Sequence, residues 1–193
     1  MKSKLELMLE ETQKEYPSFS PNLTPAQIFK MGAFHDQGGY FRDIVSISQD
    51  PLLSRIEYKK RYEIYTAKGR CLENVDINLL VSEKKDKKLN HYGVKAGTSL
   101  EYWLDKGWIN HLHPYGWVEW YCDYYDGKKS PDDERQINRW IRFASKNKGR
   151  WRRTLINKII KSGKKYDDMS VSPAIRQSLL HWGYELTEED YEA

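Results

Sequence analysis

The sequence predicts a mainly α-helical protein, a compact bundle-like single domain over residues 1–193 with a loop-rich N-terminal half. Hydrophobic residues make up 39% and charged residues 31% of the chain, which is typical of a folded domain with its own core. Three helix starts pair Ser or Thr with Pro: Thr24-Pro25, Ser130-Pro131 and Ser172-Pro173. We divide the chain into a looser region 1–97, a compact aromatic and basic helical region 98–186, and an acidic tail 187–193.

The first half predicts short helices joined by loops. Residues 2–16 have the apolar spacing of an amphipathic helix, and Thr24 begins a second, short helix that ends at Gly32. Residues 50–67 favour a helix, although the β-prone sequence YEIYT leaves a strand open. The sequence VDINLLVS (75–82) allows a short β element, and 83–97 has the composition of a polar loop.

The second half predicts longer helices. A capping-box pattern at 98–101 opens a helix that Gly107 ends. A further helix begins near 115–117 and repeats large aromatic residues at i, i+3/i+4 and i+7, which favours a core over a base-stacking surface. Acidic residues after Ser130 begin the next helix, and Gly149 separates it from a helix over 151–161. The last main helix begins at Ser172-Pro173.

Positive charge is concentrated in one segment. From Arg135 to Lys165 there are twelve Lys or Arg and no Asp or Glu, although the whole chain carries only +4. Neutralising phosphates with release of counterions is the commonest use of such a surface, so we expect a nucleic acid, DNA or RNA, as partner. The alternative is that the acidic C-terminal part covers this surface, since residues 166–193 contain seven acids and one Arg.

The predicted contacts to nucleic acid combine cations with aromatic rings. Candidate phosphate contacts are Arg135, Arg139, Arg142, Arg150, Arg152, Arg153 and Lys158. Candidate stacking residues are Tyr40, Trp140 and Trp151. Tyr40 belongs to the stretch GAFHDQGGYFRDIVS (32–46), which we call the glycine loop. Its adjacent residues Gly38 and Gly39 permit a positive φ or a close backbone approach.

Two further hypotheses belong to other classes of function. In the first, the protein is an enzyme acting on DNA, RNA or nucleotides, with Arg42 and the glycine loop lining a pocket and Asp132 or Asp133 as acid-base groups. Helix capping explains the same two carboxylates without catalysis. In the second, the protein is an interaction module whose basic face meets an acidic protein.

We expect no metal and no cofactor. His111 and His113 form a His-x-His pair, but the other candidate ligands do not stand at ligand spacing: His35, Asp36 and His181. The two cysteines, Cys71 and Cys122, are too few for a disulfide scaffold. No apolar run approaches the ~18 residues of a membrane span, and the charged N-terminus lacks the apolar core of a signal peptide. These features predict an intracellular, reducing location, without secretion or a membrane partner.

Several segments resemble a family of uncharacterised proteins that share motifs written GGxYFR, GW(F/V)xWYCxYYxG and DDxRQIxRW. The corresponding residues here are Gly38 to Arg42 (GGYFR, without an intervening residue), Gly116 to Gly127, and Asp132 to Trp140. The likeness continues through LTPAQIFKMGAF, GRWRRTLINKII and VSPAIRQSLLHWGYELTEED, and omits the ends and about 47–88.

The resemblance implies no particular activity. It implies that the glycine loop and the Asp-Asp-x-Arg-Gln helix belong to one shared design. In the family pattern the turn before Gly-Trp carries acidic residues where this chain has His111 and His113, which weakens the metal hypothesis further.

Overall fold

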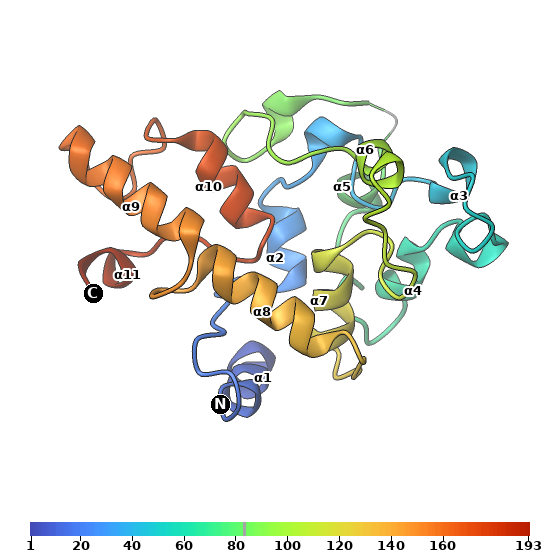
Figure 1. Ribbon diagram of the computed structural model, residues 1–193, viewed down its shortest axis with the longest axis horizontal. Helices are drawn as coiled ribbons and strands as arrows, with labels where there is room; N and C mark the ends of the chain where they lie inside the picture. Colours follow the sequence, from blue (N-terminus) through green and yellow to red (C-terminus); the bar gives the residue numbers. More distant parts are fainter. Residues whose placement is uncertain (83) are drawn as a thin grey trace.

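The structure is a computed structural model that describes residues 1–82 and 84–193, and it is mainly α-helical, which confirms the predicted fold class (Figure 1). The α-helices are α1 (Lys4–Thr12), α2 (Pro25–Lys30), α3 (Ile44–Ile47), α4 (Tyr62–Thr66), α5 (Ile77–Leu80), α6 (Leu100–Asp105), α7 (Trp117–Tyr125), α8 (Asp133–Ala144), α9 (Arg150–Ser162), α10 (Pro173–Leu180) and α11 (Glu188–Glu192). Short 3-10 helices are η1 (His35–Gln37), η2 (Ile56–Tyr58) and η3 (Lys87–Leu89). No helix in the described ranges is both long and apolar enough to cross a bilayer.

Helix α7 forms the centre of the core. It contacts α1, α2 and α8, which surround it in Figure 1. Its aromatic residues Trp117, Trp120, Tyr121 and Tyr124 are all buried. The ring of Trp120 meets Phe19 edge-on at 6.2 Å between centres, and such pairs add roughly 0.5–1.5 kcal/mol beyond the burial of apolar area. The prediction that this aromatic stripe belongs to the core is confirmed.

Helices α8 and α9 follow one another along one side of the molecule (Figure 1). The chain turns between them at Gly149, whose amide donates to the Ser145 carbonyl at 2.9 Å. A Cβ at position 149 would lie 2.3 Å from that carbonyl oxygen, so the turn requires glycine for space. The predicted break at Gly149 is confirmed.

The predicted helix starts agree with the structure at Thr24 and Ser172, whereas α8 begins two residues after the predicted Ser130-Pro131 start, with Asp132 as its N-cap. Thr24 forms a capping box with Gln27 at the start of α2. At α6 the N-cap is Ser99, which accepts from the Tyr102 amide, so the capping pattern predicted one residue earlier is shifted. Thr98 instead accepts a hydrogen bond from the indole of Trp103 at 2.5 Å.

Two predictions in the first half are wrong. Residues 50–67 do not form one helix, because Lys60 adopts a φ of +56°, which interrupts the segment between η2 and α4. The segment 75–82 contains α5 rather than a strand, since the Asp76 side chain caps the Asn78 amide. Its only β pairing among the described residues is a bridge from Val81 to Gly39. Of the polar stretch 83–97, residue 83 lies outside the described residues and the remainder contains η3.

Candidate functional site

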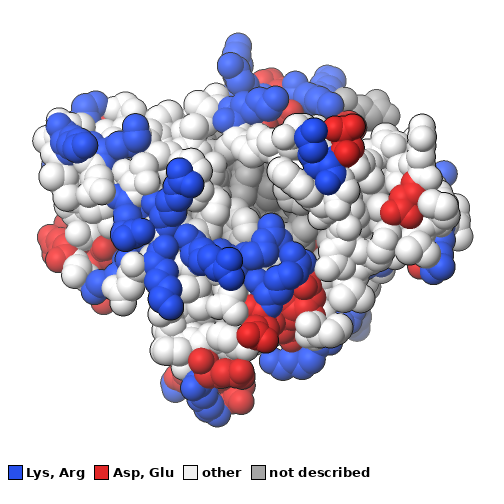
Figure 2. All heavy atoms as spheres, in the orientation of Figure 1, with Lys and Arg blue, Asp and Glu red and all other residues white. Residues whose placement is uncertain are grey.

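Exposed cations form a band along α8 and α9. We define this basic band as the predicted residues that are exposed there: Arg135, Arg142, Arg150, Arg153 and Lys158. Figure 2 shows Lys and Arg side chains along these helices, beside a hollow in the same face. Arg135 forms an ion pair with Asp132. The other four have no acidic partner within residues 1–82 and 84–193, so their charges are free for an anionic ligand.

Two predicted contact residues lie in the interior, and these predictions are corrected. Arg152 is 2% exposed, because it shares the inner face of α9 with Leu155 and Ile159. Its Nη2 lies 2.8 Å from a carboxylate oxygen of Asp190 in the C-terminal tail. Trp140 is fully buried on the inner face of α8, so neither residue can contact a nucleic acid in this fold.

The acidic C-terminal part covers the cations only locally. Asp190 neutralises Arg152, and Asp168 pairs with Lys164 at 3.3 Å. The exposed residues of the basic band keep their charge uncompensated apart from Arg135. Trp151 is half-buried, with the guanidinium of Arg150 5.6 Å from its ring centre, so one face of this predicted stacking residue is already occupied.

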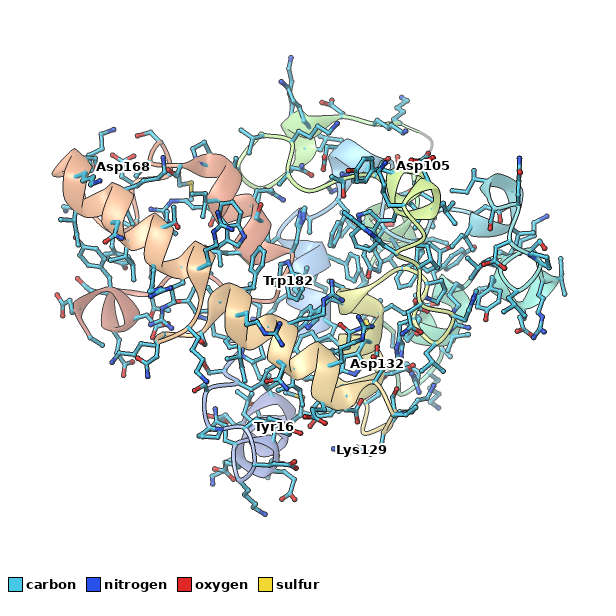
Figure 3. The ribbon with its side chains drawn as sticks, viewed as in Figure 1. Tyr16, Asp105, Lys129, Asp132, Asp168 and Trp182 are labelled. Atoms are coloured by element: carbon cyan, nitrogen blue, oxygen red, sulfur yellow. The ribbon has the colours of Figure 1, made fainter. Side chains whose placement is uncertain are left out.

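An aromatic pocket lies beside the basic band. It has a volume of about 150 Å³ and is enclosed by the glycine loop, residues 96–100, the start of α7, α8 and residues 181–182. In Figure 3, Trp182 lies near the centre of the view, directly after α10. Its ring stacks on Phe143 of α8 at 4.6 Å. The aromatic walls are Phe34, Tyr40, Trp103, Tyr115, Trp117 and Trp182.

Two tyrosines fix the glycine loop to α7. The Tyr40 hydroxyl donates to the Tyr115 carbonyl at 2.5 Å and accepts from the Glu119 amide at 3.0 Å. In return, the Tyr115 hydroxyl donates to the Arg42 carbonyl. These reciprocal hydrogen bonds hold Tyr40 in the pocket wall and satisfy both buried hydroxyls.

Gly39 allows the loop to pack closely on the end of α5. Its φ is +80°, and a Cβ at this position would lie 2.6 Å from the Leu80 carbonyl oxygen. That carbonyl accepts from the amides of both Tyr40 and Phe41. The sequence predicted that these glycines permit a positive φ or a close backbone approach, and Gly39 shows both.

Two arginines line the pocket from opposite elements. Arg42, from the glycine loop, pairs through Nη2 with Glu101, while its Nη1 is buried without a partner in the described part of the chain. This hydrogen bond lowers the pKa of Glu101 to about 2. Arg139, from α8, lies 5.2 Å above the Trp182 ring and donates to Gln136 at 2.9 Å. Burial and the neighbouring Arg135 lower the pKa of Arg139, as expected for a cation without a counter-charge.

A neutral histidine completes the pocket. His181 stacks on Phe34 at 4.2 Å, and burial lowers its pKa to about 3. The amide of Gln177 sets its tautomer. Gln177 accepts from the Tyr92 amide through Oε1, so its Nε2 must be the donor toward the Gly32 carbonyl and His181 Nε2. The proton of His181 is therefore assigned to Nδ1, which has no partner among the described residues.

A second hollow adjoins the pocket. It has a volume of about 400 Å³ and shares Thr98, Trp103 and Arg139 with the pocket. Trp108, which is 62% exposed, and Arg135 line its outer part. No Asp or Glu lines either space within the described residues. Both spaces are lined by aromatic and cationic residues, and we refer to the two adjoining spaces together as the aromatic groove.

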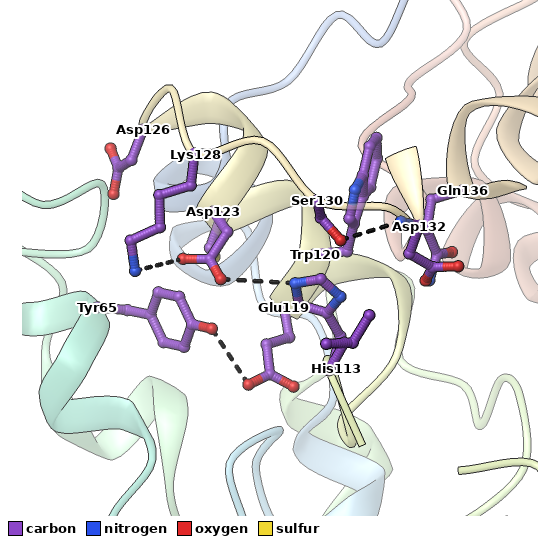
Figure 4. Close-up of polar contacts among 12 residues, drawn as sticks. Tyr65, His113, Glu119, Trp120, Asp123, Asp126, Lys128, Ser130, Asp132 and Gln136 are labelled. Carbon is purple, nitrogen blue, oxygen red and sulfur yellow. Dashed lines mark hydrogen bonds and ion pairs between the residues drawn. The ribbon is translucent and has the colours of Figure 1, made fainter. Parts of the chain in front are cut away.

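The two predicted catalytic carboxylates lie outside the pocket. Asp133 accepts from the Trp120 indole at 2.8 Å and from the Ser130 amide at 3.1 Å. Asp132 is 7% exposed and accepts from Arg135 and Gln136, beside Ser130 in Figure 4. Both carboxylates therefore stabilise the start of α8, and the proposal that they act as acid-base groups at the pocket is not supported by their placement.

Figure 4 also shows polar contacts of Glu119 and Asp123, with Tyr65 beside Glu119 and with His113 and Lys128 beside Asp123. Glu119 is fully buried and pairs with Arg61 at 2.6 Å, while burial raises its pKa. His113 lies 3.5 Å from Asp123, whereas His111 lies 3.7 Å from Asp50. The two histidines face different carboxylates. In the ranges 1–82 and 84–193, no group of three or more His, Cys, Asp or Glu side chains is placed to hold a metal ion.

The structure thus brings together some of the predicted site and adds residues that the sequence did not indicate. Tyr40, Arg42 and Arg139 meet in the pocket, next to Arg135 in the adjoining hollow. The pocket residues missed by sequence reasoning come from separate segments: Phe34, Trp103, Trp117, His181 and Trp182. Trp117 was expected only as core, and His181 only as a metal ligand. Among these residues, only the adjacent pair His181-Trp182 at the end of α10 forms a local sequence pattern that could have indicated an aromatic site.

Comparisons with protein-family models, curated proteins and solved structures find no match to this chain.

Proposed function

We propose that the protein binds single-stranded nucleic acid, with phosphates on the basic band and an unpaired base in the aromatic groove. The observation that supports this most is the position of Arg139. It stands on the same face of α8 as Arg135 and Arg142, yet its guanidinium lines the pocket. A backbone that follows α8 and α9 would therefore pass the mouth of a pocket built from aromatic rings.

The charges around the groove favour an anion. Arg139 is partly buried and forms no ion pair with an acid in the described chain. A phosphate would supply the missing acceptor, and hydrogen bonds between ionised groups are about twice as strong as neutral ones. His181 is neutral, so it adds no charge to the groove.

The aromatic walls favour unpaired bases over a duplex. Stacking on aromatic side chains is worth roughly 1–3 kcal/mol per base, and it requires a base that has left a helix. Trp108, at 62% exposure, extends this aromatic surface outside the pocket. A large ring so exposed, beside Arg135, fits a second stacked base.

Binding of labelled single-stranded DNA, single-stranded RNA and duplex DNA, measured by fluorescence anisotropy over a salt series, tests the proposal. We expect both single strands to bind more tightly than the duplex. The logarithm of the association constant should fall linearly with the logarithm of salt. Arg142→Ala and Arg153→Ala should each lower the slope by about 0.7, the contribution of one phosphate contact in a single strand.

A matched control is Arg55→Ala. Arg55 is also exposed, but it lies 3.9 Å from Glu57 and belongs to the segment before η2, outside the basic band. Its substitution should leave both affinity and slope unchanged. If all three nucleic acids fail to bind at low salt, the proposal is wrong and an acidic protein becomes the better partner for the basic band.

A further inference from the structure

We infer that the aromatic pocket accepts one pyrimidine base of a bound single strand in preference to a purine. The inference rests on the proposed function and adds to it the class of base. It follows from the volume of the pocket, from the hydrogen-bond donors that face it and from its position relative to Arg139.

The volume admits one ring. The pocket holds about 150 Å³, and a cavity of roughly that volume in another protein binds benzene. A pyrimidine is a single six-membered ring, whereas a purine has two fused rings and exceeds this space. The walls do not open easily, because the Tyr40 hydroxyl donates to the Tyr115 carbonyl and the Tyr115 hydroxyl donates to the Arg42 carbonyl. Gly116 also lets the Trp103 ring pack directly on the chain, where a Cβ would lie 2.6 Å from that ring.

The polar groups of the pocket are donors. The hydrogen-bond partners of Gln177 assign the proton of His181 to Nδ1. Cytosine, thymine and uracil all carry a carbonyl oxygen at C2, which accepts such a hydrogen bond. A buried donor that meets no acceptor loses about 1–3 kcal/mol, so His181 favours a base whose carbonyl oxygen lies within its reach.

Arg139 connects the base to the backbone. Its guanidinium lies over Trp182 at the pocket wall and also lines the adjoining hollow. A base inside the pocket therefore places its own phosphate at Arg139, and the next base in the chain beside Trp108. The outer position at Trp108 is open and aromatic, so any base can stack there, whereas the pocket discriminates between pyrimidines and purines.

The test uses short single strands of abasic residues that carry one base at the centre. Binding of strands with thymine, cytosine, adenine or guanine is measured against the fully abasic strand at constant salt. We expect thymine and cytosine to raise the affinity on the order of tenfold, the equivalent of one stacking contact. Adenine and guanine should raise the affinity only as much as stacking on Trp108 outside the pocket allows. The variant Trp108→Ala should remove that contribution.

Two variants locate the preference. His181→Phe keeps a ring against Phe34 but removes the donor, and Leu100→Trp fills the pocket from the half-exposed start of α6. Each should abolish the difference between pyrimidine and purine while leaving the affinity for the abasic strand unchanged. Because Leu100 lies at the rim, this second variant tests the pocket even if His181→Phe fails to fold.

The results separate the inference from the proposed function. If the abasic strand binds with salt dependence but pyrimidines and purines bind alike, the inference is wrong and the proposed function stands. The inference is also wrong if the preference survives in both pocket variants. If no strand binds at all, both are wrong.

Discussion

Two arginines from the same basic segment have opposite environments. Arg152, on α9, is 2% exposed and has a carboxylate of Asp190 at 2.8 Å. Arg139, on α8, is partly buried, has no acid beside it within the described residues, and faces a pocket open to solvent. The charge of Arg152 is neutralised by a carboxylate of the same chain. The charge of Arg139 is available to a ligand that enters the groove.

This difference separates a structural cation from a binding one. A buried charge without a partner is costly unless solvent or a ligand compensates it. The charge of Arg152 is compensated inside the fold, so replacing Arg152 should lower stability and leave binding unchanged. The charge of Arg139 is compensated only by solvent or ligand, so replacing Arg139 should weaken binding and leave stability nearly unchanged. The following predictions test this contrast from the largest expected effect to the smallest.

Replacing Arg152 should have the largest effect. Arg152→Ala removes the ion pair to Asp190 and the contact with the Tyr184 ring at 5.2 Å. Because Asp190 keeps some access to water, we expect a loss of about 2–3 kcal/mol in the free energy of unfolding. Urea denaturation would measure it. Unchanged stability would show that Arg152 and Arg139 do not differ in the way described.

Lowering the pH should destabilise the protein through His181. Its pKa in the folded state, about 3, lies below the ordinary value of 6.5. The unfolded state therefore binds a proton first, so the contribution of the neutral imidazole is complete above pH 6.5 and is lost as the pH falls toward 3. We expect a loss of up to about 2 kcal/mol between pH 7 and pH 5. Unfolding curves of His181→Phe should lack this part of the pH dependence.

Gly116→Ala should damage the pocket at moderate cost to the fold. Gly116 has a φ of +91°, and the added Cβ would meet Trp103 at 2.6 Å. We expect a loss of about 2 kcal/mol and weaker binding of a base. Gly127→Ala is the matched control, since its φ of +84° is similar and no atom lies within 4 Å of its Cβ position. Equal stability and equal binding in the two variants would contradict a role for the Trp103 contact.

Arg139→Ala should have the smallest effect on the fold and a clear one on binding. We expect the free energy of unfolding to change by no more than ~0.5 kcal/mol. Affinity for a single strand should fall by more than it does in Arg142→Ala, because Arg139 contacts both the pocket and the groove. Equal losses in the two variants, measured by anisotropy at one salt concentration, would reduce Arg139 to an ordinary surface cation.

The parts of the fold that were predictable are those governed by local signals. The aromatic repeat of α7, the cap at Thr24 and the break at Gly149 can each be recognised within a few residues. The segment 50–82 was mispredicted because its helices have only three to five residues and depend on tertiary contacts such as the bridge from Gly39 to Val81. Propensity is a weak guide at that length.

The site was predictable only where one segment supplied the chemistry. Tyr40 and Arg42 stand beside adjacent glycines, and Arg139 repeats with other arginines on one helix face. Trp140 was predicted as a stacking residue, but its helical register with Ile137 and Ile141 places it in the core. The pocket itself joins segments more than a hundred residues apart, such as Phe34 and His181, and no local pattern encodes that contact.

The reciprocal hydrogen bonds of Tyr40 and Tyr115 also bear on how fast the pocket can fill. Each hydroxyl holds the other residue's segment, so the glycine loop and the start of α7 must move together. A site formed before its ligand arrives needs no slow opening step, and its association is limited by encounter and orientation. Stopped-flow mixing with a single strand should then give one exponential phase whose rate rises linearly with ligand concentration.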